Sequence, residues 1–179
     1  VVKIGTSTLT HSTGKANIAL IAKLASVLSD LKNEGHQIVL VASGAISVGM
    51  GRLRLSEKPK EIQCLQAAAA GGQSELMFLY DRLFSEYDVV VSQLLLTFDE
   101  LENSDSRFHI TNTLDQLLAY DCLPIVNEND SVSVEELVSG DNDCLSATVA
   151  KITDADLLVI LTDTDGLYDG DPAENKNAK

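Results

Sequence analysis

Residues 37–45 read Gln-Ile-Val-Leu-Val-Ala-Ser-Gly-Ala, an apolar run that changes abruptly into small residues. A short run rich in Val, Ile and Leu predicts a strand that is buried on both faces, here residues 37–41. Before it, from Asn17 to Gly35, apolar side chains recur at helical spacing, with Asn17 as the expected N-cap and Gly35 at the end. Upstream, Val1–Ile4 predicts a second buried strand. Residues 1–45 therefore predict one strand–helix–strand unit.

The same alternation continues to the end of the chain. Apolar runs predict further strands at residues 89–95, 123–126 and 157–161. Helical patterns cover residues 62–70, where Gly71-Gly72 is expected to end the helix, and residues 74–85, 111–120 and 145–152. Strands that alternate with helices predict an α/β fold with a mainly parallel central sheet. Because there is no repeat, low-complexity tract or linker, we expect one domain over residues 1–179.

The charge balance excludes some classes of partner. The chain has 13 Lys+Arg against 27 Asp+Glu, a formal net charge of −14, which repels the phosphate backbone of nucleic acids. No apolar run is long enough to cross a bilayer, and no signal peptide is visible. The three cysteines lack C-x-x-C spacing, which argues against a zinc site or a disulfide framework and fits a reducing cytoplasm. We therefore expect a cytoplasmic protein that binds neither nucleic acid nor membrane.

Small and polar residues follow the predicted strands. In an open parallel sheet, ligands bind at the carboxyl ends of the strands. The first strand is followed by Gly5-Thr6-Ser7, whose N–H groups could face an anion beside the Lys3 ammonium, although an edge lysine with an ordinary turn explains the same residues. After the second strand, Ser43-Gly44-Ala45 indicates either an N-cap at Ser43 or free helix N–H groups for an anion.

Two later segments carry more polar groups than turns or caps need. Asn127-Glu128-Asn129-Asp130 follows a buried strand, and such a cluster could hold an ammonium group through Asp130. Gly140-Asp141-Asn142-Asp143 precedes a predicted helix, where one acid is ordinary but two acids and an amide are not. Thr162 and Asp163 follow the last strand. The sequence thus predicts a polar site at one edge of the sheet.

Several common motifs are absent. Gly14-Lys15 is not a Walker loop, because Leu9 stands at the first glycine position and Ala16 replaces the Ser or Thr. A G-x-G-x-x-G fingerprint fails at Arg54, and a nucleophile elbow around Ser43 fails at Val41. The acids from Asp163 onward do not have the spacing of an EF-hand. No residue is assigned to a metal.

Taken together, these segments resemble the amino-acid kinase family, and within it the members that act on unmodified glutamate. The resemblance covers essentially the whole chain. It rests on Lys3–Ser7, Ser43–Ala45, Ala69–Ser74, Gln93–Thr97, Asn127–Val132, Gly140–Ala147 and Leu161–Tyr168.

The resemblance implies a three-layer αβα sandwich that uses ATP and Mg²⁺ to phosphorylate the side-chain carboxylate of L-glutamate. Lys3 and Asp143 match catalytic positions. The other matches are glutamate-binding positions at Ser43, Gly44, Asn127, Asp130 and Asn142, and nucleotide-binding positions at Lys3, Gly5, Thr6, Ser7, Thr162 and Asp163.

The resemblance also implies a homo-oligomer, feedback inhibition by proline, and a separate or fused glutamyl-phosphate reductase that uses the product. The family carries a second catalytic lysine in a Gly-rich segment that is not found before Lys179, so we expect a kinase domain truncated on its nucleotide side. Two alternatives stay open. One is a related kinase for acetylglutamate or aspartate, and the other is a non-catalytic module that senses glutamate or proline.

Overall fold

The computed structural model describes residues 1–11, 13–133, 142–162, 166 and 169–170. Its strands are β1 (Val2–Ile4), β2 (Leu40–Ala42), β3 (Val91–Leu96), β4 (Leu123–Glu128) and β5 (Val159–Leu161). They form one five-stranded sheet in the order β3-β4-β2-β1-β5, and every pairing is parallel. The prediction of a parallel sheet is confirmed.

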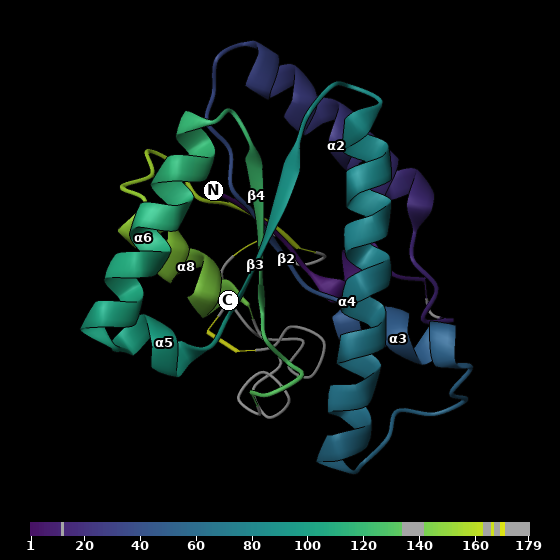
Figure 1. The fold of residues 1–179 in the computed structure, drawn as a ribbon. Helices are drawn as coiled ribbons and strands as arrows, with labels where there is room; N and C mark the ends of the chain where they lie inside the picture. The colour runs from purple at the N-terminus through teal and green to yellow at the C-terminus, as the bar shows by residue number, and fades with distance from the viewer. Residues whose placement is uncertain (12, 134–141, 163–165, 167–168, 171–179) are drawn as a thin grey trace.

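Helices cover both faces of this sheet, which gives three layers (Figure 1). One face carries α2 (Ile18–Asn33), α3 (Ala45–Leu53) and α4 (Ile62–Ser85), and the other carries α5 (Phe98–Glu102), α6 (Ser104–Ala119) and α8 (Asp143–Ile152). A short helix, α1 (Thr6–Leu9), follows β1 directly. The predicted αβα sandwich is therefore the observed architecture.

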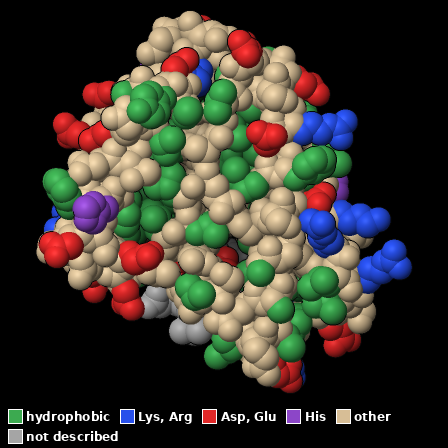
Figure 2. Space-filling view, viewed as in Figure 1, with side chains coloured by type: hydrophobic (Ala, Val, Ile, Leu, Met, Phe, Trp, Pro, Cys, Tyr) green, Lys and Arg blue, Asp and Glu red, His purple; other side chains and the backbone are tan. Residues whose placement is uncertain are grey.

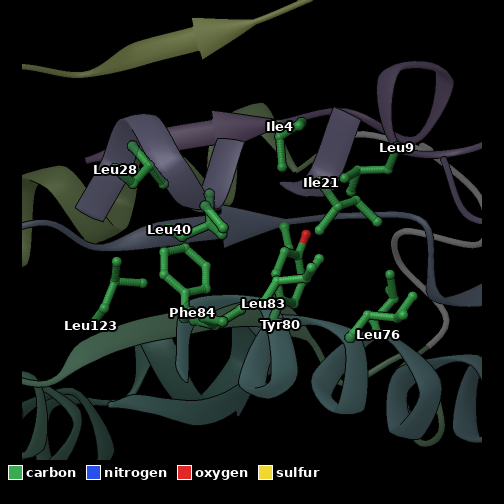
Figure 3. Close-up of a cluster of buried hydrophobic side chains, with 14 of the residues drawn as sticks. Ile4, Leu9, Ile21, Leu28, Leu40, Leu76, Tyr80, Leu83, Phe84 and Leu123 are labelled. Carbon is green, nitrogen blue, oxygen red and sulfur yellow. The ribbon is translucent and has the colours of Figure 1, made fainter. Parts of the chain in front are cut away.

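Each face of the sheet has its own hydrophobic core, because side chains alternate along a strand. Leu40 and Ile125 point to the core under α2 and α4, whereas Val41 and Val126 point to the core under α6 and α8. Figure 3 shows Tyr80 and Phe84 pointing from α4 into the first core. Burial raises the pKa of the Tyr80 hydroxyl well above its usual value, so this ring stays neutral. Strands that are apolar on both sides are thus explained by two cores.

The prediction that a helix ends at Gly71-Gly72 is wrong, because α4 runs through both residues. At Gly72, an added Cβ would lie 1.7 Å from the carbonyl oxygen of Ala45, and at Gly49 it would lie 1.8 Å from that of Ala68. These glycines let α3 and α4 cross with their backbones in near contact. In the sequence, a glycine pair that ends a helix looks the same as one that lets two helices cross. Only the presence of the neighbouring helix in the structure distinguishes the two cases.

Other helix and strand bounds differ by a few residues. Helix α6 begins at Ser104 instead of residue 111, since the Asn103 side chain accepts hydrogen bonds from the N–H groups of Asp105 and Ser106. Strand β2 begins three residues later than predicted, and β4 continues two residues further, to Glu128. The N-cap at Asn17 is confirmed by its bond from the N–H of Leu20, and Gly35 ends the turn with φ +96°.

Strand β3 forms one edge of the sheet. On the side of the molecule where this edge lies, hydrophobic side chains gather between α6 and α4 (Figure 2). Phe78 is 58% exposed and Val90 is 64% exposed.

None of the described helices is long and apolar enough to cross a membrane. Cys64, Cys122 and Cys144 are free thiols.

The close crossing of α3 and α4 predicts opposite effects for two adjacent glycines. Gly72→Ala should destabilise the protein by about 1–3 kcal/mol or more, because the new methyl group overlaps the backbone of α3. Gly71→Ala should instead stabilise it by roughly 0.5–1 kcal/mol, since nothing lies within 4 Å of its Cβ position and alanine favours a helix. Urea unfolding midpoints of the two variants measure both effects. Equal midpoints would mean that the helices do not cross this closely.

Candidate active site

The carboxyl ends of four strands and the beginning of α8 meet in one polar region. Asn142, the N-cap residue of α8, is 1% exposed and lies at its centre. Its Nδ2 donates to the carbonyl oxygen of Ala42 (2.9 Å), to Oγ of Ser43 (3.0 Å) and to Oδ1 of Asn127 (2.9 Å). One amide group therefore ties α8 to the ends of β2 and β4.

The orientation of Asn127 follows from its own bonds. Its Oδ1 also accepts from the backbone N–H of Glu128 (2.9 Å), and its Nδ2 donates to Oε1 of Gln73 on α4 (2.9 Å). Oδ1 of Asn142 is buried and has no hydrogen-bond partner among the described residues. A buried acceptor without a partner costs free energy, which a donor group on a ligand would recover.

Lys3 and Asp143 form an ion pair beside this cluster, with Nζ 2.5 Å from Oδ1. The interpretation of Lys3 as an edge lysine is wrong. Strand β1 pairs with β2 on one side and with β5 on the other, and the Lys3 side chain is only 9% exposed. A buried ammonium needs a counter-ion, and Asp143 provides one while its own side chain stays 41% exposed.

The predicted nucleotide-binding residues begin next to this ammonium. Gly5 is followed directly by α1, which contains Thr6 and Ser7, so these residues open a short helix instead of a turn. A Cβ at Gly5 would lie 3.7 Å from Nζ of Lys3, so Gly5 lies directly beside the charge. The N–H of Gly5 donates to the carbonyl oxygen of Leu161 (3.4 Å), which brings Thr162 to the same edge. Asp163, Gly140 and Asp141 lie outside the described residues.

Ser43 is not an N-cap. The N-cap of α3 is Gly44, at φ +94°, and this cap makes no side-chain hydrogen bond. Ser43 instead accepts the bond from Asn142 and is 4% exposed. The left-handed backbone of Gly44 disfavours any larger residue at this position. Ser43 is thus held inside the polar cluster.

A cleft of about 280 Å³ opens next to the cluster, between the end of β4 and the middle of α4. Asp130 lines it and is 5% exposed. Gln73, Gln93 and Glu128 also line it, and none of these side chains was assigned a role from the sequence. Gln73 lies in one of the segments that carry the family resemblance. The sequence offers one more sign that it has a function: it is a polar residue on the side of α4 that faces the rest of the protein, where most side chains are apolar. Glu128 is buried and accepts a hydrogen bond from Oγ of Ser133 (2.6 Å).

The arrangement separates two kinds of chemistry. The cleft and the amide cluster offer a carboxylate, amide oxygens and hydroxyl groups, which suit a small zwitterion that carries an ammonium group. The neighbouring end of β1 offers a cation and the first residues of α1, which suit an anion such as a phosphate. Asn142 and Asp143 are adjacent in sequence and connect the two parts. The site can therefore hold a small polar acceptor next to a phosphoryl donor.

Known proteins of similar sequence cover the whole chain. It is 51% identical to the glutamate 5-kinase of Clostridium perfringens, over 100% of this chain and 68% of that protein. It is 52% identical to the glutamate 5-kinase of Carboxydothermus hydrogenoformans, over 100% of this chain and 48% of that protein. The chain thus spans from about half to about two thirds of the length of these relatives.

A solved structure with the same fold is the isopentenyl phosphate kinase of T. acidophilum, with a TM-score of 0.62 at 17% identity over 99% of this chain and 75% of that one. At this identity the likeness concerns the fold alone. The model of the amino acid kinase family matches residues 1–179, which is every residue of the sequence. The chain belongs to the amino acid kinase family.

Proposed function

We propose that this chain carries the glutamate-phosphorylating activity of an ATP-dependent glutamate 5-kinase. The reaction moves the γ-phosphoryl group of ATP onto the side-chain carboxylate of L-glutamate and gives L-glutamyl 5-phosphate, the first step of proline biosynthesis. The observation that carries the proposal is the pair Asn142-Asp143. Asn142 organises the polar cluster, and the next residue holds the buried Lys3 ammonium. Relatives about half identical over the whole chain, all named glutamate 5-kinase, support it.

The chemistry needs position and charge more than it needs a base. The γ-carboxylate of glutamate is ionised at neutral pH and is already a nucleophile, so no group must remove a proton. Catalysis then rests on holding the carboxylate in line with the phosphoryl group and on neutralising the charge that spreads over the phosphoryl oxygens. Lys3 supplies positive charge, and Asp143 keeps its ammonium aimed at one place.

ATP would be held at Lys3, Gly5, Thr6, Ser7 and Thr162, with Asp163 as a further expected contact. The position of Gly5 beside Nζ of Lys3 fits this assignment, because it places the start of α1 next to the ammonium. Mg²⁺ would arrive on the phosphates of ATP, as it usually does, and would neutralise part of their charge. Residues 1–179 would form the kinase domain that contains these groups.

Asp130 favours unmodified glutamate over acetylglutamate. A carboxylate that is 5% exposed in the cleft gains from the positive charge of a free ammonium group, and an acetylated nitrogen carries none. Aspartate carries the same ammonium group, so only its shorter side chain distinguishes it. A module that only senses glutamate or proline would bind glutamate without transferring a phosphoryl group.

The partners follow from the proposed reaction. An acyl phosphate is labile, so a glutamyl-phosphate reductase would use the product, and proline would act as a feedback inhibitor. We also propose a cytoplasmic homo-oligomer. A second copy could cover the hydrophobic side chains at the β3 edge, because exposed edge strands tend to pair.

The reaction is tested by trapping its product. The full-length protein is incubated with ATP, Mg²⁺ and hydroxylamine, and with glutamate, acetylglutamate or aspartate in separate samples. Hydroxamate should form with glutamate and remain near background with the other two. Hydroxamate with acetylglutamate or aspartate instead would show a related kinase, whereas binding of glutamate without hydroxamate would show a sensing module.

Lys3→Met should lower kcat by roughly 100-fold or more, because it removes a charge that stabilises the transferring phosphoryl group. The KM for glutamate should change little. The variant keeps the buried volume, and Asp143 can be hydrated because its side chain is partly exposed. Lys23→Met, an exposed lysine on α2, is the control. A near-normal kcat would reduce Lys3 to a structural role.

Asp130→Asn should raise the KM for glutamate strongly while kcat and the KM for ATP change little. The substrate ammonium would enter without its counter-ion, at a cost of about 2–5 kcal/mol, which corresponds to roughly 30-fold or more. The amino group takes no part in phosphoryl transfer, so the cost falls equally on ground state and transition state. Asp81→Asn, an exposed acid on α4, is the control. A loss confined to kcat would contradict the assignment.

A further inference from the structure

The polar cluster continues beyond the residues that would touch glutamate. From Asn142 the hydrogen bonds run to Asn127, then to Gln73 on α4, and then from Nε2 of Gln73 to Oε1 of Gln93 on β3 (3.4 Å). Four amide side chains from α8, β4, α4 and β3 thus form one chain. We call it the amide relay.

The direction of every amide in the relay is set by backbone groups at one end. The carbonyl oxygen of Ala42 can only accept, so Asn142 must turn its Nδ2 towards it. The N–H of Glu128 can only donate, so Asn127 must turn its Oδ1 towards it. These two constraints agree at the bond from Asn142 Nδ2 to Asn127 Oδ1 (2.9 Å).

The remaining directions follow. With Oδ1 of Asn127 engaged, its Nδ2 faces α4, where Oε1 of Gln73 accepts from it (2.9 Å). Among the described residues, Gln73 provides the only hydrogen-bond acceptor for Nδ2 of Asn127. If this acceptor were lost, the buried amide of Asn127 would have an unpaired donor and a reason to rotate. Rotation of Asn127 would place a donor against the donor of Asn142.

We propose that Gln73 is a positioning residue for the amino-acid substrate. It holds Asn127 in one orientation, and Asn127 in turn holds Asn142. Oδ1 of Asn142 is buried and has no partner among the described residues, so it would serve as an acceptor for the substrate ammonium group. Gln73 itself need not touch the substrate. The inference rests on the proposed function for the identity of the ligand, and on the relay alone for the role of Gln73.

The first test uses kinetics on the full-length protein. Gln73→Met keeps the length of the side chain and removes the acceptor. The KM for glutamate should rise roughly 5- to 100-fold, the range expected when a buried amide loses its partner, while kcat and the KM for ATP stay within about 2-fold. Gln63→Met, at an exposed position on the same helix, should match the wild type.

A double-mutant cycle separates positioning from direct contact. In an Asn127→Ala background, Gln73→Met should add less than about 2-fold to the KM for glutamate, because the relay is already cut. If the full increase persists in that background, Gln73 contacts the substrate directly and the proposal is overturned.

A second readout needs neither substrate nor turnover. In the ligand-free protein, the side-chain ¹H–¹⁵N amide signals of Asn127 and Asn142, identified through Asn→Asp variants, should shift in Gln73→Met. They should stay near their wild-type positions in Gln73→Glu, because a carboxylate still accepts from Asn127. Unchanged Asn142 signals in Gln73→Met would overturn the relay. Absence of hydroxamate from the wild type would count against the proposed function alone, and the amide signals would still decide the role of Gln73.

Discussion

The site depends on the side-chain amide of Asn142. Its two N–H hydrogens serve three acceptors, from β2, from the residue after β2, and from β4. All of these atoms are buried, so each bond lost would leave a polar group without water to replace it. This one amide ties the beginning of α8 to the ends of β2 and β4. The remaining site residues take their places around it: Ser43 and Asn127 as direct partners, and Asp143 as the next residue along α8.

The glycine-lined crossing of α3 and α4 has a consequence for the site. Gly49 and Gly72 bring the two helices together, and the neighbouring Gln73 then reaches Asn127 across the end of β4. With alanine at position 72, α4 would move outward, and the bond from Asn127 to Gln73 would lengthen. The orientation of the buried Asn127 amide therefore depends on the close packing of α3 and α4.

The sequence allowed the strands to be located because each is a short run that is apolar on both faces, as the two cores around Leu40 and Val41 explain. It also singled out Asn127 and Asp130, since polar residues after a buried strand have few structural reasons to be there, and Asn142, since a helix start needs fewer polar groups than this segment carries. It misplaced the end of a helix at Gly71-Gly72, because a glycine pair that ends a helix and one that lets helices cross have the same composition. It missed the hydrogen bond between Gln73 and Asn127 because the two residues are 54 positions apart, and a local pattern carries no information about such a contact.

The ammonium of Lys3 is buried in a chain whose net charge is strongly negative. In a chain of formal charge −14, a lysine on the surface would be surrounded by many carboxylates and would be free to pair with any of them. On β1, between two neighbouring strands, the Lys3 side chain has little freedom, and Asp143 pairs with it at 2.5 Å. The Asp143 side chain is 41% exposed, so it keeps contact with water while it pairs with this ammonium. A confined cation of this kind gives a strongly acidic chain one local point of attraction for an anion.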